Sequence, residues 1–273
     1  MDYQQFIQSK KHTLGDHGFD PVWMPDCVFD FQQQIITKAI RKGRMGVFAD
    51  TGLGKTLLQL AIAENVVRKT NGRVLILTPL AVAFQFVDEA SRIGVGDIAH
   101  SKDGTIKAKI TVCNYERLHL LNPDDFECVM LDESSILKNF AGKTRDQIVA
   151  FIKRVRYRFL STATPSPNDF IELGNSSEAL GYMGYMDMLT KFFKSNQNSV
   201  DSNNRNIGEK FYLKPHAEKD FFAWVNQWSV MVKRPSDLGF SDERYKLPSL
   251  ITNRHIVQNK STWVIDSQES LFA

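Results

Sequence analysis

Residues 49–56, with the sequence Ala-Asp-Thr-Gly-Leu-Gly-Lys-Thr, constrain the fold most strongly. In such a loop glycines turn backbone N–H groups toward phosphate oxygens, the lysine reaches the terminal phosphates, and the threonine hydroxyl can bind magnesium. The segment departs from the pattern G-x-x-x-x-G-K-[ST] only at Ala49, which is also small. The residues expected to bind the nucleotide are Thr51, Gly52, Leu53, Gly54, Lys55 and Thr56.

The flanking segments indicate a strand before this loop and a helix after it. Residues 45–48 are mostly apolar, and Leu57, Leu60, Ala61 and Val67 recur at helical spacing before the stop signal Asn71-Gly72. The alternative, a strand-to-helix turn that merely ends in Lys-Thr, remains open on the motif alone.

A second segment predicts the partner of this loop. The apolar run 128–131 ends in Asp132 and Glu133, where one carboxylate can hold magnesium and the other can orient the attacking water. We therefore expect Lys55, Asp132 and Glu133 to be catalytic, with ATP as substrate and Thr56 and Asp132 on the magnesium ion. The alternative for an isolated Asp-Glu pair is a strand end that meets solvent.

Strand-like and helix-like segments alternate along the middle of the chain. This alternation predicts an α/β fold, a P-loop domain with a RecA-like parallel sheet, helices on both faces, and ligands at the carboxyl ends of the strands. Strands are expected at 45–48, 74–77, 110–113, 128–131 and 158–160, and helices at 81–93, 115–121 and 146–155.

Composition excludes several classes of protein. No uninterrupted apolar stretch reaches 18 residues, and the first ten residues have no signal-peptide core. Three widely spaced cysteines, Cys27, Cys113 and Cys128, form no disulfide framework or zinc motif. We expect a cytoplasmic protein without a membrane partner.

The net charge of +3 is uninformative, but basic residues gather between Lys138 and Arg158, where Asp146 is the only acid. This run could meet a phosphate backbone or form a solvated helix face. Its members are Lys138, Lys143, Arg145, Lys153, Arg154, Arg156 and Arg158.

Six segments occur in an order that resembles superfamily-two helicases. They are Phe31-Gln32-Gln33, the P-loop, Leu77-Thr78-Pro79-Leu80, Cys113-Asn114-Tyr115-Glu116, Asp132-Glu133-Ser134-Ser135 and Ser161-Thr162-Ala163-Thr164-Pro165. The chain is most similar to Swi/Snf-like DNA translocases, particularly phage- and prophage-encoded members, in which Lys-Asn often follows the acidic motif, as Lys138-Asn139 does here. The resemblance extends over about residues 28–250.

The resemblance implies a role for each matching residue. Gln32 would read the adenine edge, and Thr78, Pro79, Asn114 and Tyr115 would touch the nucleic-acid backbone. Thr162 and Thr164 would couple the state of the nucleotide to that contact. One departure is Ser135, which stands where the DEAD and DEAH patterns place aspartate or histidine.

The resemblance also divides the chain. We expect an N-terminal extension (1–25), a RecA-like ATP-binding domain (26–175), a helical extension (176–248) with a mobile loop near 195–210, and a possible start of a second motor domain (249–273). Within the extension, residues 215–232 are expected to form one amphipathic helix. No complete second RecA-like domain follows, so the isolated chain should turn over ATP weakly.

The expected function is an ATP-dependent helicase or translocase, with double-stranded DNA as the favoured track and a bacterial or phage-infected cell as its setting. RNA remains open as a track because the motifs contact backbone. Two alternatives also stay open: a non-catalytic module that binds nucleotide and nucleic acid, and the motor portion of a restriction or phage-defence complex.

Overall fold

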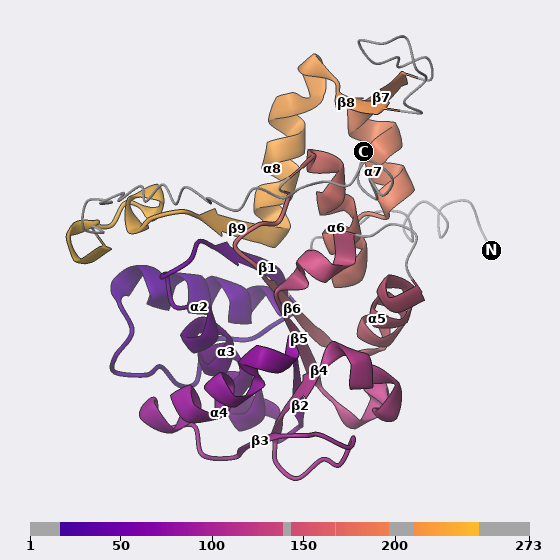
Figure 1. Ribbon diagram of the computed structural model, residues 1–273. Coiled ribbons are helices and arrows are strands. Elements are labelled where there is room, and N and C mark those ends of the chain that lie inside the picture. The colour runs from indigo at the N-terminus through magenta and orange to yellow at the C-terminus, as the bar shows by residue number, and fades with distance from the viewer. Residues whose placement is uncertain (1–16, 139–142, 167, 197–209, 246–273) are drawn as a thin grey trace, which may run out of the picture.

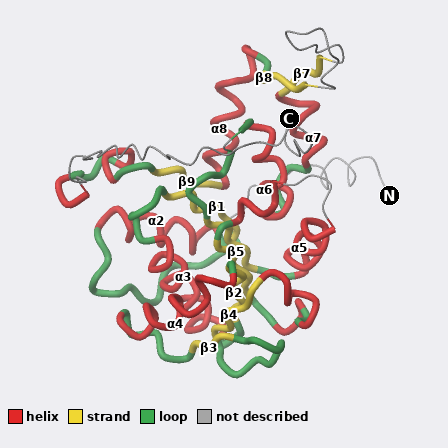
Figure 2. Tube along the Cα trace, in the orientation of Figure 1, coloured by secondary structure: helices red, strands yellow, loops and turns green. Residues whose placement is uncertain are grey.

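A parallel sheet forms the centre of the molecule, as the computed structural model shows for residues 17–138, 143–166, 168–196 and 210–245 (Figures 1 and 2). The strands lie in the order β3-β4-β2-β5-β6-β1-β9 and all pair in parallel. The predicted α/β fold is confirmed. The strand bounds are Arg44–Ala49 (β1), Val74–Thr78 (β2), Ile98–His100 (β3), Ile110–Asn114 (β4), Cys128–Asp132 (β5), Tyr157–Ser161 (β6) and Ser229–Val232 (β9).

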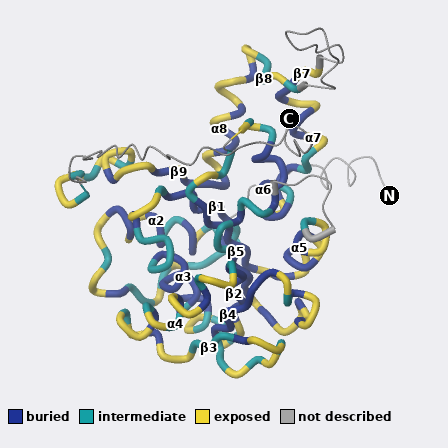
Figure 3. The backbone as a smooth tube through the Cα atoms, in the orientation of Figure 1, coloured by how far each residue is buried: buried dark blue, intermediate teal, exposed yellow. Residues whose placement is uncertain are grey.

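Helices cover both faces of the sheet, which explains why its central strands are apolar at nearly every position (Figure 3). One face packs against α2 (Asp30–Lys42), α3 (Lys55–Thr70) and α4 (Ala83–Arg92). The other packs against α5 (Lys143–Arg154), α6 (Leu173–Leu180) and α8 (Glu218–Trp228).

The remaining elements project beyond the sheet. Helix α7 (Tyr185–Phe192) contacts α6, and the strands β7 (Phe193–Asn196) and β8 (Lys210–Leu213) form an antiparallel pair beside it (Figure 1). Buried aromatic side chains of α7 and α8 join this projection to the sheet domain; Phe192 lies 5.5 Å from Trp224 between ring centroids. Among the described helices, none is both long and apolar enough to cross a membrane.

The sequence prediction of one helix over residues 215–232 is wrong at its end. Helix α8 stops at Trp228, Ser229 is extended, and the next residues form β9 beside β1. Val230 and Val232 are buried there. A short apolar run such as Ser229–Val232 fits either a helix end or a buried strand, and pairing with β1 decides for the strand.

Smaller differences affect other predictions. The expected helix at 81–93 is α4 preceded by a 3-10 turn, and the one at 115–121 is a 3-10 helix, Tyr115–Leu120. Strand β3 was not predicted. Of the loop expected near 195–210, the ends belong to β7 and β8, and residues 197–209 lie outside the described residues, as does the segment 249–273.

Candidate functional site

The P-loop joins the carboxyl end of β1 to the first turn of α3. Gly52 and Gly54 have φ values of 84° and 81°, a backbone region that side chains disfavour, so glycine is required for this turn. The Lys55 ammonium group donates to the carbonyls of Ala49 and Asp50 at 3.1 and 3.3 Å. The loop is thus formed around its own lysine, with the first N–H groups of α3 facing the same end of the sheet.

Gln32 lies against this loop. It is 4% exposed; its amide donates to the Leu53 carbonyl at 3.0 Å, and its oxygen accepts from the Phe29 N–H at 3.0 Å. A Cβ atom on Gly54 would come within 2.6 Å of the Gln32 amide nitrogen. In this arrangement Gln32 holds the loop through the Leu53 carbonyl, and its role in reading adenine stays a prediction.

A cavity of about 410 Å³ opens at the start of α2, lined by Phe29 and Phe31 among others. Its walls come from the start of α2 and from a segment more than 200 residues later. The Arg244 guanidinium lies 5.5 Å from the centroid of the Phe29 ring, and Tyr245 contacts Phe29 edge to face at 5.6 Å. No local sequence pattern predicts this cavity, because the two segments that line it are far apart in the chain.

Asp132 ends β5 and is held by hydrogen bonds on both carboxylate oxygens. Gln59 donates to Oδ1 and Thr78 to Oδ2, each at 2.9 Å. Burial raises the pKa of Asp132 above its ordinary value, while these two hydrogen bonds act to lower it. The charge of Glu133 adds to the rise, and that of Lys55 opposes it.

Glu133 connects the acidic motif to the end of β6. It has a φ of 51°, unusual for a residue with a side chain, and accepts a 2.6 Å hydrogen bond from the Thr162 hydroxyl. The Thr164 N–H donates in turn to that hydroxyl at 3.1 Å. Although Ser135 departs from the DEAD and DEAH patterns, the two motifs are linked here through Glu133.

The site suits a hydrated magnesium ion and a nucleotide. Magnesium keeps several water ligands and takes few from protein, so Asp132 and Thr56 suffice. Gln59 is 2% exposed, and its carbonyl oxygen has no partner among the described residues, although its amide holds Asp132. A buried acceptor of this kind is suited to the water ligands of such an ion. Sequence analysis missed Gln59, yet its i,i+4 spacing from Lys55 places both on one helix face.

The residues expected to touch nucleic acid are mostly buried. Thr78 is 0% exposed, Asn114 donates to Glu116 at 2.9 Å, and the Tyr115 hydroxyl donates to the Asp132 carbonyl at 2.6 Å. Burial, together with the charges of Asp132 and Glu133, raises the pKa of Tyr115 well above its ordinary value. Thr78 and Tyr115 thus bond to the acidic motif, whereas Asn114 bonds to Glu116. Pro79 is half-buried and its neighbour Leu80 is exposed. The contact of these residues with nucleic acid stays a prediction.

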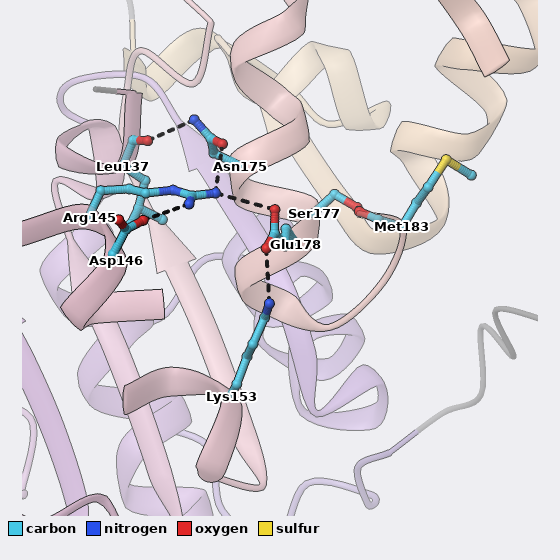
Figure 4. Close-up of polar contacts among 8 residues, drawn as sticks. All are labelled: Leu137, Arg145, Asp146, Lys153, Asn175, Ser177, Glu178 and Met183. Carbon is cyan, nitrogen blue, oxygen red and sulfur yellow. Dashed lines mark hydrogen bonds and ion pairs between the residues drawn. The ribbon is translucent and has the colours of Figure 1, made fainter. Parts of the chain in front are cut away.

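Several described side chains of the basic run have partners within the protein; Figure 4 shows two of them, Arg145 and Lys153. Arg145 and Lys153 both pair with Glu178, at 3.2 and 2.9 Å, and Arg154 pairs with Asp124. Arg158 is 6% exposed and donates to the carbonyls of Val155, Ala179 and Lys153; burial, and secondly the charge of Arg44, lower its pKa to about 10. The run also leads to the amino end of β6, away from the P-loop. The side chains of Lys138 and Lys143 are not described.

The fold and this site define a RecA-like P-loop domain with an acidic strand end beside the phosphate loop. Residues 29–172, more than half of the chain, match the model of the DEAD/DEAH box helicase family, and the chain belongs to that family. It is accordingly a superfamily-two helicase-type domain, in a family whose members are typically ATPases.

Individual relatives are longer than this chain. The structure of the Sulfolobus solfataricus SWI2/SNF2 ATPase core in complex with dsDNA superimposes with a TM-score of 0.58 at 18% identity, covering 78% of this chain and 46% of that one. The Sulfolobus solfataricus SWI2/SNF2 ATPase core domain gives 0.55 at 19% identity, covering 83% and 46%. The DNA annealing helicase and endonuclease ZRANB3 of Mus musculus is 26% identical over 192 residues, 64% of this chain and 18% of its own length.

Proposed function

We propose that this chain is the first motor domain of an ATP-dependent translocase or helicase that moves on or remodels double-stranded DNA. The observation that carries the proposal is the pair of hydrogen bonds reaching Asp132 from two other strand ends, one from Thr78 and one from Tyr115. The Thr78 hydroxyl donates to the carboxylate expected to hold magnesium, and the Tyr115 hydroxyl donates to the backbone carbonyl of the same residue. The sheet edge expected to meet nucleic acid therefore contacts Asp132 at two points.

In this proposal the P-loop binds ATP. Backbone N–H groups of residues 51–56 surround the phosphates, Lys55 leaves the carbonyls of Ala49 and Asp50 to pair with them, and Thr56 and Asp132 hold magnesium. When bound, the ion would neutralise phosphate charge. Glu133 orients the attacking water and accepts its proton, and its bond to Thr162 transmits the state of the nucleotide to Thr164.

The double-stranded track is supported by the likeness to the SWI2/SNF2 core, which was solved with dsDNA. Contacts from strand-end turns to phosphates would hold the duplex without reading its sequence. We further infer a setting in the cytoplasm of a bacterium or a phage-infected cell, as the resemblance to phage-encoded members suggests.

Full turnover would need a second RecA-like domain. Superfamily-two motors hydrolyse ATP between two such domains, and in related phosphoryl-transfer enzymes an added arginine contributes about 10³ to 10⁵ in rate. The chain spans 46% of the SWI2/SNF2 core structures. Alone, it should bind ATP and hydrolyse it slowly, with little stimulation by DNA.

Two variants test the proposal. Lys55→Ala should abolish detectable ATP binding in calorimetry while melting like the wild type, because the lysine's bonds in the free protein go only to loop carbonyls. Glu133→Gln should retain ATP binding and abolish the phosphate release seen when a second motor domain is added. Unchanged ATP affinity in folded Lys55→Ala would contradict the P-loop assignment.

A further inference from the structure

Four side chains form a cluster at the outer carboxyl edge of the sheet, outside the nucleotide site. They come from three places: Phe84 from the first turn of α4, His100 and Lys102 from the end of β3, and Arg117 from the 3-10 helix after β4. Phe84 is 56% exposed and meets the His100 ring edge to face, with centroids 5.0 Å apart. The Lys102 ammonium lies 5.1 Å from the centroid of Phe84. We call these four residues the edge cluster.

Two side chains of the edge cluster have buried nitrogen atoms without hydrogen-bond partners in the described structure. Both ring nitrogens of His100 and one terminal nitrogen of Arg117 are buried and have no hydrogen-bond partner among the described residues. Burial lowers the pKa of His100, and the positive charges of Lys102 and Arg117 lower it further, which favours a neutral imidazole. Leaving buried donors unpaired costs free energy that an anionic ligand would recover.

Two acids adjoin the cluster in sequence, and each has a hydrogen bond of its own, although hydrogen bonds and, less strongly, the charge of Arg117 lower the pKa of Glu116. Glu116 accepts from the Asn114 amide at 2.9 Å, and Asp103 accepts from the Thr105 N–H at 3.0 Å. The cluster also adjoins the edge of the proposed track, because β3 pairs with β4, and β4 with β2, placing His100, Asn114 and Thr78 on successive strand ends. A nucleic-acid strand bound along that edge of the sheet would continue onto Phe84.

We propose that the edge cluster binds an unpaired nucleotide, with the base stacked on Phe84 and the phosphate held by Lys102 and Arg117. This inference rests on the proposed function and names the nucleic-acid feature that the domain prefers. A continuous duplex offers phosphates and sugars but keeps its bases stacked on one another. Its bases are therefore not available to stack on an exposed aromatic ring such as Phe84. A ring among cations is the composition of single-strand binding sites. The preferred ligand is thus a duplex with a single-stranded overhang.

Fluorescence anisotropy with two DNAs tests this: a blunt duplex, and the same duplex with an overhang of eight unpaired nucleotides. The wild-type chain should bind the overhang DNA more tightly. Phe84→Ala should remove that preference, a loss of about 5- to 150-fold for one stacked base, and leave blunt-duplex affinity unchanged. Lys102→Gln should lower the log–log salt slope on the overhang DNA by about 0.7, the value for one phosphate contact on a single strand.

Matched controls lie elsewhere on the surface. Phe222→Ala removes an exposed aromatic ring of α8, and Arg73→Gln removes an exposed cation at the amino end of β2; both should keep the preference. Phe84→Leu keeps apolar volume without the ring and should behave like Phe84→Ala, and melting temperatures should match the wild type.

The outcomes separate this inference from the proposed function. Equal wild-type affinity for the two DNAs, or a full preference retained in Phe84→Ala, overturns the unpaired-nucleotide site while duplex binding stands. The second result would favour a protein partner at Phe84. The unpaired-nucleotide site is also overturned if Phe84→Ala lowers the affinity for both DNAs by the same factor. If the wild type binds neither DNA, the DNA track itself is refuted.

Discussion

Replacing Gln59 by leucine should weaken only the magnesium-dependent part of ATP binding. Gln59 donates to Asp132 at 2.9 Å, and its buried carbonyl oxygen lacks a partner in the described structure. Without ligand, leucine loses a hydrogen bond to a carboxylate, worth about 1.5–3 kcal/mol, but also removes an unpaired buried acceptor that costs about 1–3 kcal/mol. The two effects nearly cancel, so stability should change little.

When ATP and magnesium are bound, the two effects of Gln59→Leu no longer cancel. If the carbonyl of Gln59 accepts from the water ligands of a bound magnesium ion, the leucine variant loses both interactions and recovers nothing. The loss is then about 1–2 kcal/mol, or roughly 5- to 30-fold in ATP affinity.

Calorimetric titration with ATP in magnesium and in a chelator measures the two affinities separately. Wild type and Gln59→Leu should agree in chelator and differ in magnesium. Gln147→Leu, the same change at an exposed position on α5, is the matched control. The role assigned to Gln59 would be refuted if ATP affinity depended equally on magnesium in all three proteins. It would also be refuted if Gln59→Leu lost as much ATP affinity in chelator as in magnesium.

Three further predictions follow from other contacts. Phe29→Ala should weaken ATP by about 1–3 kcal/mol and leave tripolyphosphate binding unchanged in calorimetry, since only the base would stack there; parallel losses would place the base elsewhere. Glu178→Gln should lower the free energy of unfolding by about 1 kcal/mol at pH 7. Burial acts to raise the pKa of Glu178, but Lys153 and Arg145 outweigh this effect, so the pKa in the folded protein is below the ordinary value of 4.5. In denaturant titrations, the difference in free energy of unfolding between wild type and variant should therefore persist above pH 4.5. It should disappear as the pH falls through the pKa of the folded protein. Affinity for duplex DNA should fall with salt at a log–log slope of about −0.9 per phosphate, and Arg154→Gln should leave that slope unchanged because Arg154 already pairs with Asp124; a shallower slope would return the basic run to the interface.

Local patterns predicted the parts of the molecule that depend on local interactions. The P-loop, the buried strands and the acidic strand end each carry their signal within about ten residues. Their convergence followed from parallel topology alone, which places carboxyl ends on one edge. The P-loop follows the end of β1 and Asp132 ends β5, so both lie at the carboxyl edge of the parallel sheet.

What the sequence missed depends on partners distant in the chain. Thr78 reads as an ordinary strand end, and only the position of β5 beside β2 turns its hydroxyl toward Asp132. Strand β3 is three residues long and half-buried, too short for a periodic signal. The ion pairs of the basic run could not be read locally, because their acidic partner Glu178 lies on another helix, α6.

Strand β9 has a consequence for how the protein is made. The Asp50 N–H at the start of the P-loop donates to the Val232 carbonyl at 2.9 Å, so the loop is anchored by residues synthesised much later. A nascent chain therefore completes its phosphate loop only after residue 232 has emerged, and nucleotide cannot stabilise it earlier. A protein cut at Glu172, where the family match ends, would leave β1 as an exposed apolar edge, open to pairing with other chains. The foldable unit is longer than the set of motifs that identifies it.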